Sequence, residues 1–403
     1  MNELEAFRQH VCEWLEENAP LGLRNTSTSL FQGHWGGRRA VFASDDVRLW
    51  FERASAKGWT APGWPVEYGG GGLQRSKVRI INEELTRLGL PRPLAGFGLT
   101  MIGPILLEYG SPLQQQEHVK KIVQGQVRWC QGYSEPNAGS DLASLQMRAV
   151  RDGDHFVING QKVWTSYADK ADWMFCLVRT STEGKKQAGI TFILVDMKTS
   201  GITTRPIELI SGSSPFCEVF FEDVRVPAAN VIGEVNEGWK IAKSLLGHER
   251  DMVGQAVVSG GSRPDVLRDF SLRSLATSVV GLEDGEIADP LLRDAIAQAE
   301  MDRACAQLTI QRVGDGQRAG HKPGPESSIF KVYGTELNQR RWDLAMRILA
   351  EEGLGWDGQE ISDVNRAIPR TWLRSRGNTI EGGSSEIQLT IIATRVLGLP
   401  RKG

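Results

Sequence analysis

The segment WCQGYSEPNAGSDL, at residues 129–142, runs from a short apolar stretch into a dense cluster of small and polar residues. Gly139 and Ser140 could present backbone N–H groups and a hydroxyl to a phosphate or to the polar edge of a ring. The alternative reading is a simple surface turn. The segment therefore predicts a strand that ends at Tyr133, followed by either a ligand-binding loop or an ordinary turn.

In a second segment, VINGQKVWTS at residues 157–166, the residues after Asn159-Gly160 have the composition of a strand. Trp164 offers a flat face to an aromatic ligand. Ser166 lies two residues further on, and the alternation of a strand places it on the same side. The alternative is a tryptophan buried in the protein core.

Around these segments the apolar residues recur every second position. Dipeptides typical of two-residue hairpins occur at Asp152-Gly153 and Asn159-Gly160. No helical pattern interrupts the region, so it predicts an antiparallel β-barrel or sandwich. The expected strands are residues 155–159, 162–166, 173–179, 190–197 and 217–221.

Helical periodicity flanks the strand-rich region on both sides. The N-terminal part is broken by a glycine- and proline-rich joint, GWTAPGWPVEYGGGG (58–72), and is followed by a helix face with Val78, Ile81, Leu85 and Leu88. The C-terminal part predicts helices over 291–314, 328–353 and 384–397, and a surface loop over 284–289. The predicted fold class is α+β multidomain. Its parts are a helical domain (1–126), an antiparallel β-barrel (127–238) and a domain resembling a four-helix bundle (239–403).

Composition excludes several classes of protein. The 403 residues carry a formal net charge of −2, which disfavours nucleic acid as a partner. No apolar run is long enough to cross a bilayer, and the acidic N-terminus is unlike a secretory signal, so we expect no membrane association and a cytoplasmic location. The five cysteines are scattered, which predicts reduced thiols, and the histidines show no ligand spacing, which predicts no metal.

Familiar nucleotide and serine-enzyme fingerprints are missing. Neither GxGxxG after a strand nor GxxxxGK[ST] occurs, which disfavours a nicotinamide site or a P-loop. Ser328-Ile329-Phe330-Lys331 matches SxxK, but the companion KTG is missing downstream. We interpret that match as chance.

The long motifs resemble the acyl-CoA dehydrogenase family. The two segments quoted first are similar to its flavin-binding barrel, GWTAPGWPVEYGGGG to its N-terminal joint, and NTIEGGSSEIQLTIIATRVLGLPR (378–401) to its last motif. The resemblance covers nearly the whole chain. It implies FAD as the cofactor, an acyl-CoA as the substrate, and electron-transfer flavoprotein or a similar protein as the electron acceptor. The implied reaction is α,β-desaturation, in which a glutamate takes the α proton and a hydride leaves for flavin N5.

The resemblance also implies roles for individual residues. Tyr133 and Ser134 would meet the pyrimidine side of the flavin, Trp164 would lie beside the ring, and Ser166 would approach N5. Gly139 and Ser140 would lie near the FAD pyrophosphate and the acyl-CoA. The last motif would contribute Ser384 and Glu386 as flavin contacts, at the start of a helix whose N-terminus suits a phosphate.

The catalytic base is not at its commonest family position. Where many members have the glutamate of a YEGT motif, this chain has Gly382, and Glu381 is one residue too early. Isovaleryl-CoA and long-chain acyl-CoA dehydrogenases carry the base just before an arginine on a C-terminal helix, which matches Glu249-Arg250 here. The resemblance thus implies Glu249 as the base, Arg250 at the substrate, and the Gly382 N–H as a donor to the thioester carbonyl.

The residues around Glu249 agree with this assignment. Ala242, Leu245 and Leu246 form an apolar stripe, and Glu249 falls on the same helix face. Burial would raise the pKa of its carboxyl toward the range useful for a general base. The alternative is a glutamate that pairs with an arginine at a domain junction.

Two family features are missing, and both concern FAD contacts made across a subunit interface. An arginine followed by Phe-Gly has no counterpart between Arg263 and Pro290, and a Gly-Gly pair is replaced by Ala350-Glu351. The sequence therefore leaves open a homotetramer or an α2β2 heterotetramer with a homologous subunit, as in the steroid- and side-chain-degrading members. A bulky or branched acyl group is expected. A partner subunit that only completes another chain's site, and a flavin oxidase or monooxygenase on the same fold, stay open as alternatives.

Overall fold

The computed structural model describes residues 3–27, 32–246, 265–267, 269–319, 324–358 and 360–400. The chain divides into two compact units. The first draws on residues 1–208 and 214–248, and the second on residues 209–213 and 249–403. Each unit is described by itself below.

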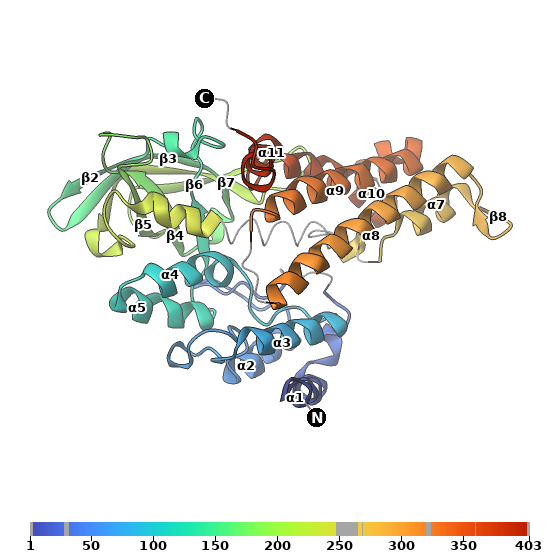
Figure 1. Cartoon of the computed structure of the whole chain (residues 1–403), viewed down its shortest axis with the longest axis horizontal. Helices are drawn as coiled ribbons and strands as arrows, with labels where there is room; N and C mark the ends of the chain where they lie inside the picture. The colour runs from blue at the N-terminus through green and yellow to red at the C-terminus, as the bar shows by residue number, and fades with distance from the viewer. Residues whose placement is uncertain are drawn as a thin grey trace. The chain divides into compact units, whose positions relative to one another are not determined.

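The first unit begins with helices, as the periodicity predicts (Figure 1). Their apolar faces meet in a core that includes Leu15, Trp50 and Leu85. Ser111 opens the last of these helices with a capping box, in which its hydroxyl and the Gln114 side chain satisfy each other's backbone N–H groups. The helices are α1 (Glu3–Asn18), α2 (Asp45–Ala56), α3 (Arg75–Arg87), α4 (Gly103–Tyr109) and α5 (Pro112–Val123).

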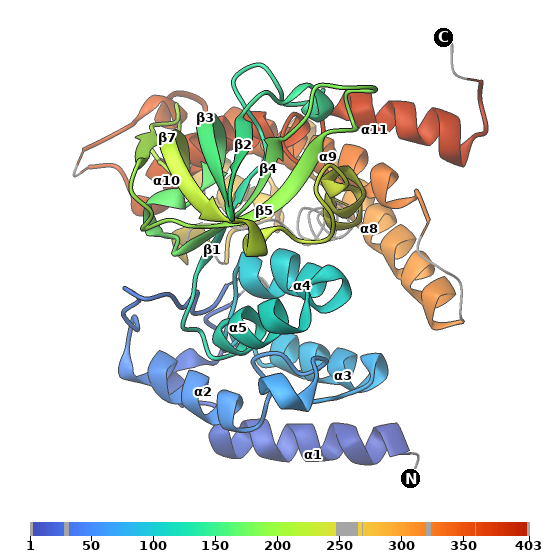
Figure 2. The same ribbon diagram turned by 90° about the vertical axis from the view of Figure 1, so that its left-hand side faces the viewer.

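The remainder of the first unit is a seven-stranded sheet. The strands are β1 (Trp129–Gly132), β2 (Arg148–Asp152), β3 (His155–Ser166), β4 (Trp173–Arg179), β5 (Ile190–Asp196), β6 (Ile202–Ile207) and β7 (Phe216–Pro227). Their order is β1-β4-β2-β3-β7-β6, and β5 pairs with β4. In Figure 2 these strands curl together above α4 and α5.

The prediction of a closed antiparallel barrel was wrong in two respects. The sheet is a curled half-barrel, because β5 and β6 do not pair with each other among the described residues. It is also mixed, because β1 and the start of β4 run parallel from Trp129↔Trp173 to Gly132↔Cys176. The reason is the order of the strands along the chain. The β2–β3 hairpin lies between β1 and β4 in the sequence and brings the chain back to the end of the sheet at which β1 began, so β4 runs in the same direction as β1.

One of the two predicted hairpin turns is present in the structure, and the other is not. Asp152-Gly153 does end β2 and turn the chain into β3. Asn159-Gly160 instead lies inside β3, at a register shift against β7, with Gly160 at φ 142°. Both polar atoms of the Asn159 amide bond Asp223 on β7, so the dipeptide forms a β-bulge rather than a turn.

Strands β4 and β5 are almost completely buried and mostly apolar. Six of the seven residues of β4 are buried, and so are six of the seven residues of β5. Phe175 and Phe192 stack at 6.2 Å between ring centroids, and the Tyr133 ring meets both edge-on at 6.0 Å and 6.3 Å. The end of β1 therefore rests on a rigid aromatic pair.

The second unit is a set of packed helices (Figure 1). Its core gathers Leu275, Ile296, Trp342 and Ile368 from four different helices. The predicted helices are present, and α7 and α10 are additional. The predicted loop over 284–289 instead includes a small hairpin of β8 (Leu282–Glu283) and β9 (Glu286–Ile287). The helices are α7 (Leu272–Val280), α8 (Pro290–Arg318), α9 (Ser327–Leu349), α10 (Asp363–Ser375) and α11 (Ser385–Ile391).

No helix in the described part of the chain is both long and apolar enough to cross a membrane. The described residues also contain no group of three or more His, Cys, Asp or Glu side chains that could hold a metal ion.

His118 makes the stability of the first unit depend on pH. Its ring is 2 % exposed and lies edge-on to Trp129 and Trp173, at 5.4 Å and 4.7 Å between centroids. Burial lowers the pKa of His118 to about 4, so the folded state holds the neutral ring. As the pH falls from about 6.5 toward 4, His118 is protonated in the unfolded chain but stays neutral in the folded chain. The free energy of unfolding therefore falls by roughly 2–3 kcal/mol.

Replacing His118 by phenylalanine is expected to flatten this acid-side loss. Urea unfolding at pH 7.5, 6, 5 and 4 measures it, with the substitution of exposed His10 by glutamine as the control. An unchanged pH profile in His118→Phe would contradict the assignment.

Candidate active site

The loop that leaves β1 at Tyr133 is folded back on itself and anchored. Glu135 and Ala138 exchange backbone hydrogen bonds at 3.1 Å and 3.0 Å, which closes a tight turn. The Ser134 carbonyl accepts from the N–H of Val163 on β3 at 2.9 Å. The loop therefore follows one path against the sheet.

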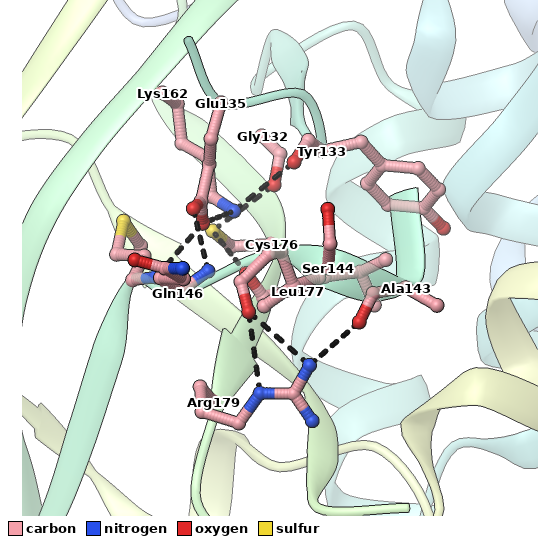
Figure 3. Close-up of polar contacts among 12 residues, drawn as sticks. Gly132, Tyr133, Glu135, Ala143, Ser144, Gln146, Lys162, Cys176, Leu177 and Arg179 are labelled. Atoms are coloured by element: carbon pink, nitrogen blue, oxygen red, sulfur yellow. Dashed lines mark hydrogen bonds and ion pairs between the residues drawn. The ribbon is translucent and has the colours of Figure 1, made fainter. Parts of the chain in front are cut away.

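A buried ion pair lies beneath this loop (Figure 3). The Lys162 Nζ, on a side chain with no exposed surface, lies 2.8 Å from Glu135 Oε1 and 3.1 Å from the Tyr133 carbonyl. The Glu135 carboxylate also accepts from the backbone N–H groups of Gln146 and Met147, at 2.6 Å and 2.9 Å. One pair of charges thus binds both ends of the 133–147 loop.

Arg179, at the end of β4, holds the returning limb of the same loop (Figure 3). Its guanidinium donates to the carbonyls of Ala143 at 2.7 Å and of Leu145 at 3.1 Å and 3.2 Å. It also donates to the carbonyls of Lys186 and Ala188 in the next loop. These five hydrogen bonds all end on backbone carbonyls, so Arg179 holds two loops together.

The apex of the loop faces solvent. Gly139 and Ser140 are exposed, and a Cβ added at Gly139 would meet nothing within 4 Å. The φ of Gly139 does not lie in the left-handed region. Neither packing nor backbone conformation therefore requires a glycine at this position.

Trp164 is on the surface of the sheet, not in its core. Its side chain is 55 % exposed, and its backbone has φ 60° where β3 shifts register against β7 between Lys162 and Thr165. A tryptophan in this region is uncommon and costs on the order of 1–3 kcal/mol. The ring of Phe216 lies nearly perpendicular to it, with centroids 6.0 Å apart. The alternative of a tryptophan buried in the core is therefore wrong.

Ser166 ends β3 opposite Phe216 and is half-buried. Trp164 also lies on β3, and the Ser134 carbonyl is bonded to the same strand through the Val163 N–H. The structure therefore places Ser134, Trp164 and Ser166 on or against one strand.

The predicted contacts of the last motif belong to the second unit. Ser384 caps α11, and its hydroxyl accepts from the Ile387 N–H at 3.4 Å. The Glu386 carboxyl has a pKa below its ordinary value, because the backbone N–H of Glu386 and the Ser384 hydroxyl donate hydrogen bonds to it. Gly382 and Gly383 precede the cap with φ 60° and 90°, a turn that favours glycine at both positions.

Glu381 is committed to the second unit's own structure. Arg374 donates to its carboxylate at 2.7 Å and 3.4 Å, and the Asn378 amide donates at 2.5 Å. The buried Lys331 Nζ binds the Asn378 carbonyl at 2.9 Å and so supports the same turn. The Glu381 carboxylate therefore already has partners within the second unit, in Arg374 and Asn378.

Glu249 and Arg250 lie outside the described residues, so their assignments remain predictions. The sequence patterns did not identify Glu135, Lys162 and Arg179, which hold the loop. A signal was present: Glu135 directly follows Ser134, and Lys162 lies two residues before Trp164. Lysine and glutamate are seldom fully buried unless they are paired, and no sequence pattern reports that pairing.

Three family models match the chain in order. They are the acyl-CoA dehydrogenase N-terminal domain over residues 2–126, the middle domain over 130–224 and the C-terminal domain over 236–397. The chain is 36 % identical to acyl-CoA dehydrogenase IpdE1 of Mycobacterium tuberculosis, across 100 % of this chain and 99 % of that protein.

Solved structures agree with these matches. The steroid ACAD Tcur3481-Tcur3483 superposes with a TM-score of 0.76 at 28 % identity, covering 99 % of this chain and 98 % of that one. The ChsE4-ChsE5 complex from Mycobacterium tuberculosis superposes with a TM-score of 0.73 at 27 % identity, covering 100 % and 99 %. The chain therefore belongs to the acyl-CoA dehydrogenase family, whose members are FAD-dependent enzymes.

Proposed function

We propose that the chain catalyses the FAD-dependent α,β-dehydrogenation of an acyl-CoA thioester. The anchored 133–147 loop, with its open glycine at the apex, is the observation that carries the proposal. Exposed Trp164 with its strained backbone lies on the adjacent strand, as a ring-binding platform requires. FAD fits these residues, because they offer an aromatic face, hydroxyls and an uncovered glycine.

Each residue has a proposed task. The cofactor contacts are Tyr133, Ser134, Gly139, Ser140, Trp164, Ser166, Ser384 and Glu386. FAD, when bound, supplies the hydride acceptor. Glu249 removes the α proton, and the Gly382 N–H stabilises the negative charge that develops on the thioester oxygen. Ser140 and Arg250 bind the acyl-CoA.

We propose a bulky or branched acyl group of the steroid side-chain type as the substrate. Gly382 has no side chain where many family members carry a glutamate, which leaves room near the α carbon. Similar proteins include a steroid ACAD and the ChsE4-ChsE5 complex from Mycobacterium tuberculosis. Electrons then pass to electron-transfer flavoprotein or a similar acceptor.

The assembly is proposed to be an α2β2 heterotetramer, with a homotetramer as the alternative. Ala350 ends α9 with φ 49° and ψ −121°, a conformation typical of glycine. Ala350-Glu351 stands where the family has a pair of glycines, and the backbone at Ala350 still has a glycine-like conformation. The two side chains would then lie where the family's backbone approaches the FAD of a neighbouring subunit. That change suits a chain whose partner supplies part of the site.

Anaerobic mixing with a panel of acyl-CoAs tests the proposal. Bleaching of the oxidised flavin absorbance by a bulky acyl-CoA supports it. Rapid reoxidation of the reduced flavin by air would favour an oxidase instead. A homotetramer purified alone with one FAD per subunit would remove the need for a partner, and a chain that is inert with every acyl-CoA beside an active homologue would be a silent subunit.

Replacing Ala350 by glycine is expected to stabilise the second unit. The substitution relieves a strain of roughly 1–3 kcal/mol, partly offset by the added freedom of glycine in the unfolded chain. We expect a net gain of about 1 kcal/mol, seen as a higher urea midpoint with an unchanged slope. Ala345→Gly, at a buried position of α9, is the control and should lower the midpoint. A lower midpoint in Ala350→Gly would contradict the strained conformation.

A further inference from the structure

The buried Glu135–Lys162 pair is difficult to explain as a source of stability. The Lys162 side chain has no exposed surface and that of Glu135 only 9 %. Desolvation of two charges offsets most of their attraction, so apolar residues of similar size stabilise a protein core at least as well. The contacts of the pair, and not its net energy, point to its role.

Those contacts all converge on the backbone of one loop. Lys162 binds the Tyr133 carbonyl at 3.1 Å, and Glu135 binds the N–H groups of Gln146 and Met147 (Figure 3). The pair therefore fixes the start and the end of the 133–147 loop with respect to β3. In the same region the thiol of Cys176 donates to the Gly132 carbonyl at 3.2 Å, and burial raises the pKa of that thiol to about 12.

The peptide between Tyr133 and Ser134 is left with a defined polarity. Lys162 occupies the Tyr133 carbonyl, and the Val163 N–H occupies the Ser134 carbonyl. Among the described residues, none accepts from the Ser134 N–H, and none bonds the Ser134 hydroxyl. The carbonyls of Tyr133 and Ser134 are thus bonded within the protein. The N–H and the hydroxyl of Ser134 remain available to a ligand that carries acceptor atoms.

The pair also constrains the strand that carries Trp164. Lys162 is the last regularly paired residue before the register shift of β3, and Trp164 follows it with φ 60°. A side chain anchored inside the sheet at residue 162 opposes slippage of the strand at this irregularity. The same lysine therefore holds both segments proposed to meet the flavin.

We infer that Glu135 and Lys162 are positioning residues for the flavin ring. They orient the Tyr133–Ser134 peptide and the Trp164 bulge, and they do not themselves touch the cofactor. This inference rests on the proposed function, because it takes the loop and Trp164 to be flavin contacts. It predicts that removal of the pair loosens FAD while the fold survives.

The test is the double variant Glu135→Gln/Lys162→Met in the purified holoprotein. The glutamine oxygen still accepts from the Met147 N–H, and no unpaired charge remains in the core. We expect a melting temperature near that of the wild type, a dissociation constant for FAD raised at least about tenfold, and a shifted absorbance spectrum of the bound flavin. Equilibrium dialysis against FAD measures the constant.

Asp172→Asn is the matched control. Asp172 is also buried and accepts from two backbone N–H groups, those of Arg38 and Arg128, beside the start of β1 rather than its end. It is expected to lose stability and keep its FAD affinity. Equal loss of FAD in Asp172→Asn and the double variant would reduce the pair to a general structural role and overturn the inference.

Two further outcomes distinguish failure of this inference from failure of the proposed function. A folded double variant with wild-type FAD affinity and spectrum would overturn the inference and leave the proposed function intact. A wild-type holoprotein without FAD would overturn the proposed function itself. If the double variant does not fold, the single variant Glu135→Asp is measured by the same criteria, since it keeps both charges in the core and withdraws the carboxylate from the loop backbone.

Discussion

Replacing Glu249 by glutamine is expected to abolish flavin bleaching by acyl-CoA while FAD stays bound. Glutamine keeps the size of the side chain but cannot take up the α proton. A well-placed general base contributes roughly 10²–10⁴-fold to the rate, so reduction of the flavin should slow by about that factor. Stopped-flow absorbance under anaerobic conditions measures the rate, and the oxidised spectrum before mixing reports FAD content.

Glu381→Gln is the matched control for this variant. The structure shows Glu381 held by Arg374 and Asn378, so this carboxylate already has partners in the turn before Gly382. Its substitution is expected to loosen that turn modestly and to leave bleaching in place. Normal bleaching in Glu249→Gln together with its loss in Glu381→Gln would move the base to Glu381 and refute the assignment.

Replacing Phe175 by alanine is expected to destabilise the first unit by about 3–5 kcal/mol. The ring is completely buried, stacks on Phe192 and supports the edge of Tyr133. Its removal leaves a cavity beneath the end of β1, from which the 133–147 loop departs. We therefore expect a lower urea midpoint and also weaker FAD binding, because the start of the 133–147 loop loses the ring on which Tyr133 packs.

Val150→Ala serves as the comparison for Phe175→Ala. Val150 is 46 % exposed on β2, and its truncation should change stability by no more than about 0.5 kcal/mol. Phe175→Leu should fall between the two, since it keeps most of the buried volume. A loss below about 1 kcal/mol in Phe175→Ala would show that the aromatic pair is not the support described here.

Periodicity and turn residues were enough to predict the α–β–α order and most of the elements. They were not enough to predict how the strands pair. Asn159-Gly160 has the composition of a hairpin turn, yet the chain continues straight through it as a bulge, because Asp223 on the neighbouring strand satisfies the Asn159 amide. That partner is 64 residues away, and local sequence carries no information about it.

The site was predictable to a similar depth. The motif located the loop and the tryptophan, but it could not say that Trp164 is exposed, since the exposure depends on a register shift against β7. Nor could it say that Lys162 points inward to Glu135. Both facts arise from strand pairing, which converts a one-residue irregularity into a choice of face.

The exposure of Trp164 also gives the protein an optical reporter. Of the 12 tryptophans in the chain, Trp164 is the most exposed among those that the structure describes, whereas Trp50, Trp129 and Trp342 are enclosed in cores. An accessible indole is quenched by dissolved acrylamide, and its emission overlaps the absorption of an isoalloxazine ring. Intrinsic fluorescence from this one side chain would therefore report, without any label, when a ring covers the sheet and when it departs.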